Sequence, residues 1–199
     1  MTKYILNSGG TSSHPEKAFK FFNEIVKDLG KNPRILFCFF AQKREDWEEK
    51  FEKYKKGFNE KMQDGINPEF ELAFPDKFIN QVKENNAIVI FGGDDTLVQY
   101  WLGKFDLPKI WENKVVASNS AGSNALVESS WTCDWRKCID GLGILPIKFI
   151  PHYKSTKYSK KDPRGPIDWN NALKELEEYG DKSSPIHALE EGDFTVIEN

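Results

Sequence analysis

The run Ile35-Leu36-Phe37-Cys38-Phe39-Phe40 constrains the fold more than any other stretch of the chain. Six consecutive apolar residues leave no side for solvent, which is typical of a strand covered on both faces in a parallel sheet. Parallel neighbours need crossover connections, so strands and helices should alternate along the sequence. They do alternate. We therefore expect an α/β fold, a doubly wound, mostly parallel sheet with helices on both faces.

The alternation is regular enough to name the expected elements. In chain order they are a strand over 4–7, a helix over 15–29, the strand 34–40, a charged helix within 44–62, a strand over 70–74, a helix over 77–84, a strand over 87–91 and a helix through 97–105. After residue 126 we expect a strand over 143–151, a polar loop over 154–166 that acts as a mobile lid, a helix over 168–179, and a terminal hairpin of 186–189 with 194–197. The length suits one domain, residues 1–199.

Composition excludes several classes of function. Lys and Arg number 28 against 31 Asp and Glu, a net charge of −3, and the basic residues are scattered, so nucleic acid is not an expected partner. No apolar run is long enough to span a bilayer and residues 1–6 lack a signal-peptide core, so we expect no membrane association and a cytoplasmic location. The three cysteines, Cys38, Cys133 and Cys138, indicate neither a disulfide nor a metal site. We expect no metal and no organic cofactor, and nothing in the sequence indicates an oligomeric state.

The stretch from Lys114 to Leu126 joins an apolar strand to a helix through a turn of small residues. This arrangement is typical of the G-x-S-x-G nucleophile elbow, with Ser118 in place of the first glycine and Ser120 at the apex. The turn lifts the apical side chain clear of the sheet, and a helix beginning at Ala121 points backbone N–H groups toward any group bonded to the Ser120 oxygen. An ordinary serine-rich turn is the alternative interpretation.

Three segments fall at the carboxyl ends of expected strands, where ligands of doubly wound sheets bind: Gly92-Gly93, Ser120 and His152. A serine needs a base to remove its proton, and His152 is better placed for this than the other two histidines, His14 and His187, which we expect to be structural. Candidates to orient His152 are Asp134, Asp140 and Glu128.

Backbone N–H groups at Gly92-Gly93 and Ala121 would complete an oxyanion hole. Asp94 and Asp95 either cap the following helix or contact a cationic ligand group.

Taken together, these motifs resemble the dipeptidase E family, the aspartyl dipeptidases, which are related to cyanophycinases and share a fold like that of class I glutamine amidotransferases. The segment Phe91-Gly92-Gly93-Asp94-Asp95-Thr96 is similar to the family's glycine-rich turn, Asn119-Ser120-Ala121-Gly122-Ser123 to its nucleophile motif, and Gly141-Leu142-Gly143 through Pro151-His152-Tyr153 to its histidine segment. The resemblance implies Ser120 as nucleophile, His152 as base, and Gly93 and Ala121 as the oxyanion hole. It also singles out Asp134 as the third member, although the connection from Asp134 to Gly141 is shorter than in the dipeptidases.

The chain departs from this family where substrate is selected. The arginine that recognises an N-terminal aspartate finds no match, and Asp168 lies near its position with Arg164 close by. We predict substrate contacts from Gly92, Asp94, Asp95, Arg164 and Asp168. The acids should favour a neutral or basic first residue and make Asp-X dipeptides poor substrates. Arg164 and the lysines at 154, 157, 160 and 161 would act in the opposite direction if the loop closes.

The sequence thus predicts a serine peptidase of the dipeptidase E type, which hydrolyses short peptides through an acyl-enzyme on Ser120. The rival hypothesis is a catalytically inactive relative that serves as a small-molecule or peptide-binding module.

Overall fold

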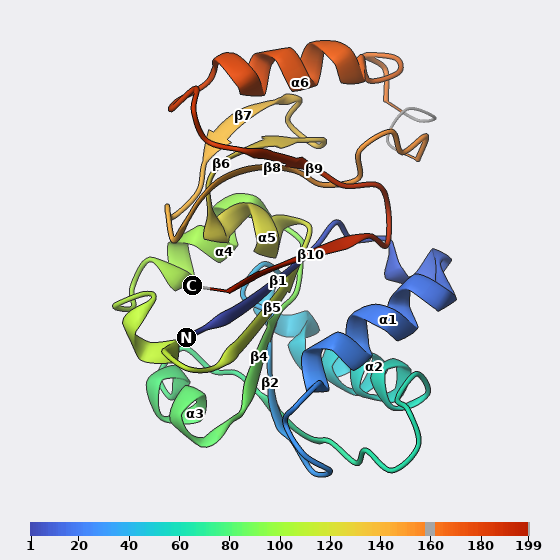
Figure 1. The fold of residues 1–199 in the computed structure, drawn as a ribbon, viewed down its shortest axis with the longest axis vertical. Coiled ribbons are helices and arrows are strands. Elements are labelled where there is room, and N and C mark those ends of the chain that lie inside the picture. Colours follow the sequence, from blue (N-terminus) through green and yellow to red (C-terminus); the bar gives the residue numbers. More distant parts are fainter. Residues whose placement is uncertain (158–161, 199) are drawn as a thin grey trace.

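The computed structural model describes residues 1–157 and 162–198 and contains two sheets (Figure 1). The larger sheet has the strand order β10-β1-β5-β4-β2-β3. Its parallel strands are β1 (Lys3–Asn7), β2 (Arg34–Cys38), β3 (Glu69–Leu72), β4 (Ala87–Ile90) and β5 (Val115–Asn119). The last strand, β10 (Phe194–Glu198), pairs antiparallel with β1. The predicted mostly parallel α/β fold is confirmed.

Helices cover both faces of this sheet. In Figure 1, α1 (Pro15–Val26) and α2 (Trp47–Asn59) lie on one side, and α3 (Phe78–Glu84) and α4 (Asp95–Leu102) lie on the other. Short 3₁₀ turns precede α1 at Thr11–Ser13 and α2 at Arg44–Asp46, and a third spans Lys109–Trp111. The apolar run that predicted a two-sided strand is fully buried from Ile35 to Phe40. Phe37 packs against Phe51 and Phe58 of α2.

A smaller sheet, which the sequence did not predict, stands at one end of the larger one (Figure 1). After the short α5 (Ala121–Leu126), the chain forms β6 (Val127–Thr132), β7 (Lys137–Asp140) and β8 (Leu145–Ile150), and β9 (Ile186–Ala188) completes the order β7-β6-β8-β9. Helix α6 (Trp169–Glu178) packs on it through a separate apolar cluster that includes Trp131, Ile150 and Leu176.

The expected terminal hairpin is wrong. Strand β9 pairs with β8 in the smaller sheet, and β10 pairs with β1 in the larger sheet. Each strand fills an open edge of a different sheet, so the five residues 189–193 between them carry the chain from one sheet to the other. This crossing places an acidic turn at the junction of the two sheets.

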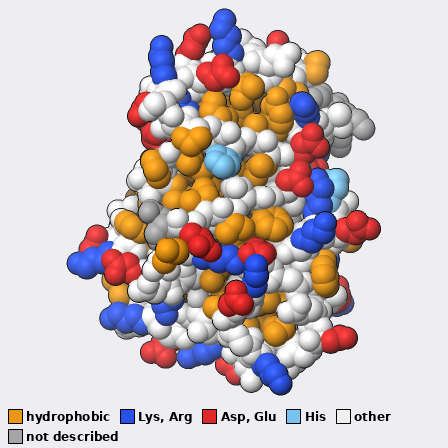
Figure 2. Space-filling view, viewed as in Figure 1, with side chains coloured by type: hydrophobic (Ala, Val, Ile, Leu, Met, Phe, Trp, Pro, Cys, Tyr) orange, Lys and Arg blue, Asp and Glu red, His pale blue; other side chains and the backbone are white. Residues whose placement is uncertain are grey.

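On the face drawn in Figure 2, basic and acidic side chains are interspersed. Among the helices of residues 1–157 and 162–198, none combines the length and hydropathy that crossing a membrane requires.

Candidate active site

Ser120 stands between β5 and α5, in the predicted strand, turn and helix. Its backbone has φ 49° and ψ −119°, a conformation that non-glycine residues adopt only where the surroundings impose it. The Ser120 N–H donates to the carbonyl of Asn7 at 3.0 Å, and its own carbonyl accepts from the N–H of Ser123 at 2.8 Å. Gly122 permits the close approach of α5 to β4, because a Cβ there would lie 2.6 Å from the Ile90 carbonyl oxygen. The elbow is therefore fixed on both sides.

His152 faces Ser120 from the smaller sheet, two residues after β8 ends. Its Nε2 lies 3.0 Å from the Ser120 Oγ, and its backbone N–H donates to the Ser8 Oγ at 2.6 Å. The residue is only 5% exposed. Burial lowers the pKa of His152 below its ordinary value, against the opposing effect of the Glu191 charge. A neutral imidazole beside the hydroxyl is the form that can accept its proton.

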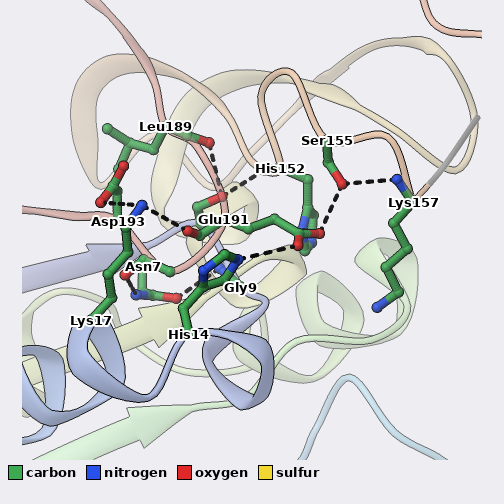
Figure 3. Close-up of polar contacts among 12 residues, drawn as sticks. Asn7, Gly9, His14, Lys17, His152, Ser155, Lys157, Leu189, Glu191 and Asp193 are labelled. Atoms are coloured by element: carbon green, nitrogen blue, oxygen red, sulfur yellow. Dashed lines mark hydrogen bonds and ion pairs between the residues drawn. The ribbon is translucent and has the colours of Figure 1, made fainter.

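Glu191 lies on the other side of this imidazole, in the turn that crosses between the sheets (Figure 3). Its Oε1 is 3.2 Å from Nδ1 of His152 and also accepts a hydrogen bond from the Ser155 Oγ at 2.9 Å. Although burial acts to raise the pKa of Glu191, the contacts with Ser155 and His152 hold it below its ordinary value. Ser120, His152 and Glu191 thus form a continuous hydroxyl, imidazole and carboxylate arrangement.

Glu191 has the contact with His152 that the family resemblance led us to expect of Asp134. Asp134 is exposed in the turn between β6 and β7, where its carbonyl accepts from Arg164 at 2.9 Å, and its charge affects the pKa of His152 less than that of Glu191 does. The other two candidates lie elsewhere: Glu128 accepts from the Ser184 Oγ at 2.5 Å, and Asp140 is exposed at the end of β7. A catalytic role for Asp134 stays a prediction, whereas Glu191 has the contact that the role requires.

Glu191 was missed because Glu190-Glu191-Gly192-Asp193 has the composition of an ordinary hairpin turn. The signal that would have found it is topological. Only when the two flanking strands are assigned to different sheets does the turn fall beside the end of β8.

The glycine-rich turn after β4 packs directly against the elbow. A Cβ on Gly92 would lie 2.9 Å from the Ser120 Cβ, and the Gly92 N–H donates to the Asn119 Oδ1 at 2.7 Å. The turn is also held from behind, since the Gln42 side chain donates to the Gly92 carbonyl. Within the part of the chain that the structure describes, the N–H groups of Gly93 and Ala121 have no acceptor. The Ala121 amide directly follows the nucleophile and that of Gly93 directly follows Gly92, and their role as an oxyanion hole stays a prediction.

The acids predicted to contact substrate make structural contacts. The Asp94 carboxylate caps α4 by accepting from the N–H of Leu97 at 2.8 Å, and Asp168 caps α6 by accepting from Asn170 and Asn171 at 3.1 and 3.0 Å. Capping was one of the two roles left open for Asp94.

Asp95 is only 5% exposed and accepts hydrogen bonds from Asn124 at 2.9 Å and Thr132 at 3.1 Å. Burial is the main cause that raises its pKa. This buried network joins α4 to α5 and β6, so Asp95 stabilises the position of α5, the helix that follows Ser120.

The predicted lid is described only in part, because residues 158–161, which include Lys160 and Lys161, lie outside the described residues. Arg164 is exposed and pairs with Asp162 at 2.5 Å. Lys154 and Lys157 line a cavity of about 760 Å³ that reaches Glu191 and also borders His14 and Lys17.

Comparisons with known proteins show what the chain is similar to. The model of peptidase family S51 matches residues 4–199. A crystal structure of a peptidase from an acI-B1 actinobacterium superposes with a TM-score of 0.63 at 20% identity, covering 99% of this chain and 83% of that one. A putative peptidase E protein from Listeria monocytogenes EGD-e superposes with a TM-score of 0.63 at 14% identity, covering 100% and 99%. At these identities the likeness shows a shared fold. No curated protein sequence matches the chain significantly.

Proposed function

The chain belongs to peptidase family S51, and on that premise we propose that it is a serine dipeptidase that hydrolyses short peptides through an acyl-enzyme on Ser120. The observation that carries the proposal is the 3.0 Å contact between the Ser120 Oγ and Nε2 of His152. A serine hydroxyl is a weak nucleophile until a positioned base takes its proton, and this contact supplies the base.

The remaining groups have consistent roles. As the Ser120 Oγ attacks the scissile carbonyl carbon, Nε2 of His152 takes the hydroxyl proton, and Glu191 stabilises the resulting imidazolium at Nδ1. The oxygen of the tetrahedral intermediate binds the N–H groups of Gly93 and Ala121. His152 then protonates the leaving amine. Water, deprotonated by the same imidazole, attacks the acyl-enzyme and regenerates the Ser120 hydroxyl.

The rival hypothesis keeps the fold without the reaction, as a module that binds peptides or small molecules. The two differ in whether Ser120 is nucleophilic. A fluorophosphonate probe reports this directly: stoichiometric labelling of Ser120 supports the peptidase, and an unlabelled but folded protein supports the binding module.

The substrate is tested with a dipeptide library on wild type, Ser120→Ala and Ser12→Ala, the last being an exposed serine in the turn before α1 that serves as the matched control. We expect cleavage by wild type and Ser12→Ala and a loss of several orders of magnitude in Ser120→Ala. Hydrolysis that survives in purified Ser120→Ala would overturn the proposal.

The same library tests the prediction that Asp-X dipeptides are poor substrates. Asp94, Asp95 and Asp168 now have structural partners, so the argument from their charges is weaker than the sequence suggested. Arg164 likewise already pairs with Asp162. The highest kcat/KM for Asp-X peptides would contradict the prediction, and the loss of that preference in Arg164→Gln would assign it to Arg164.

A further inference from the structure

The carboxylate of Glu191 is bounded by two histidines. Its Oε1 faces Nδ1 of His152 at 3.2 Å, and its Oε2 lies 3.8 Å from Nε2 of His14 (Figure 3). His14 comes from the turn before α1, far from β8 in both sequence and sheet. Its side chain is 40% exposed, whereas that of Glu191 is 16% exposed. Both side chains line the same cavity, and His14 is the more exposed of the two.

Close packing keeps His14 and Glu191 in this relation. Gly10 has φ 72°, and a Cβ there would lie 2.9 Å from the Glu191 Cβ, so the turn before α1 lies directly against the Glu191 side chain. The Gly192 N–H donates to the Gly9 carbonyl at 2.7 Å, and the Lys17 Nζ donates to the Glu191 carbonyl at 3.1 Å. Three contacts of different kinds thus join the two segments.

Other charged side chains lie near His14 and Glu191. Lys17 forms an ion pair with Asp193 at 2.9 Å, which offsets its charge. Lys157 acts on both Glu191 and His152 through its charge. Among the described residues, the charged groups that border this region are Lys17, Lys154, Lys157, Glu190 and Asp193, and the charge of Asp134 also acts on His152. Histidine is the side chain whose charge ordinarily changes between pH 5 and 8.

We propose that His14 is a positioning residue of the peptidase reaction, which lies against the second oxygen of Glu191 and, when protonated, opposes protonation of His152. The inference rests on the proposed function, because it assigns the role of a group that acts on the Ser120, His152 and Glu191 arrangement.

The direction of the effect follows from the charges. When His14 is protonated, a positive charge lies on the side of the Glu191 carboxylate opposite His152. It offsets part of the negative charge that stabilises cationic His152. A nearby like charge disfavours the charged form, so protonated His14 makes His152 harder to protonate. The base form of His152 then persists to lower pH, and removing His14 should raise the pH at which His152 titrates.

The test compares wild type with His14→Gln, Ser155→Ala and His187→Gln. His14→Gln removes the charge while keeping an amide that can reach Oε2. Ser155→Ala removes a neutral hydrogen bond to Oε1. His187→Gln removes a histidine in β9 and serves as the matched control. The imidazole signals are titrated by NMR, and the rate of Ser120 phosphonylation by a fluorophosphonate is measured against pH.

We expect His14→Gln to raise the titration midpoint of His152 by about 0.5 pH unit, to move the acid limb of phosphonylation by the same amount, and to lose this shift in 1 M salt. Ser155→Ala should lower the midpoint, because Glu191 is then held less firmly, and His187→Gln should leave it unchanged. An unchanged or lowered midpoint in His14→Gln, or an equal rise in His187→Gln, would overturn the inference. The NMR titration decides this even if no dipeptide is cleaved, whereas failure of the proposed function would appear as unlabelled Ser120 in wild type.

Discussion

Gly9 and His152 approach each other so closely that no side chain larger than hydrogen fits between them. A Cβ on Gly9 would lie 2.6 Å from Cε1 and 2.9 Å from Nε2 of His152, and 3.3 Å from the Ser120 Cβ. Gly9 follows β1, so the larger sheet supplies a wall against which the imidazole of the smaller sheet rests. The contact sets the distance between nucleophile and base.

Gly9→Ala should therefore lower kcat/KM by roughly 10²-fold or more, since displacing a reacting group by about 1 Å has effects of that size. Gly65→Ala is the matched control: Gly65 has φ 85°, close to the 96° of Gly9, but no atom lies within 4 Å of its added Cβ. It should share the backbone strain and keep full activity. Equal losses in the two variants would show that strain, and not the contact with His152, is responsible.

The third member of the catalytic arrangement can be assigned by exchanging carboxylates for amides. Glu191→Gln should lower kcat by roughly 10⁴, because an amide at Oε1 no longer holds the required tautomer of His152. Asp134→Asn should have a much smaller effect. Steady-state kinetics of both variants on one dipeptide decides between them. If the larger loss falls on Asp134→Asn, the assignment from the sequence is right and that from the geometry is wrong.

The pH dependence of activity should reflect the burial of His152. Burial lowers the pKa of His152, so the neutral base persists below the ordinary histidine value of about 6.5. The acid limb of kcat/KM should lie below pH 6.5. The burial of His152 also makes stability depend on pH. The unfolded chain takes up the His152 proton at a higher pH than the folded chain does. The contribution of this group to the free energy of unfolding therefore falls as the pH drops below about 6.5. An acid limb above pH 6.5 would contradict the prediction.

The two adjacent aspartates after the glycine-rich turn should differ in stability measurements. Asp95→Ala leaves the Asn124 amide and the Thr132 hydroxyl buried without their acceptor, which should cost about 2 to 4 kcal/mol of unfolding free energy. Asp94→Ala removes only a helix cap and should cost about 1 kcal/mol. Urea denaturation measures both. Asp95→Asn should leave KM unchanged, and an increase in KM at wild-type stability would restore the predicted role of Asp95 in substrate binding.

The sequence by itself determined the parallel strands of the larger sheet and the elbow, because both depend on local patterns. The apolar runs at 35–40, 87–91 and 115–117 specify buried strands without reference to the rest of the chain, and the small residues around Ser120 specify a sharp turn. His152 was found for a similar reason, since it follows an apolar strand.

Only the tertiary structure decided how that site is completed. The segment 127–140, rich in polar residues, forms strands because β6 pairs with β7 and β8 and packs against α5 and α6, not because its own periodicity is strong. Strands β9 and β10 then pair with edges in different sheets, and the turn between them carries Glu191 to Nδ1 of His152 across 39 residues of chain. Strand pairing is a long-range choice, and a local pattern of alternating residues does not say which edge a strand will join.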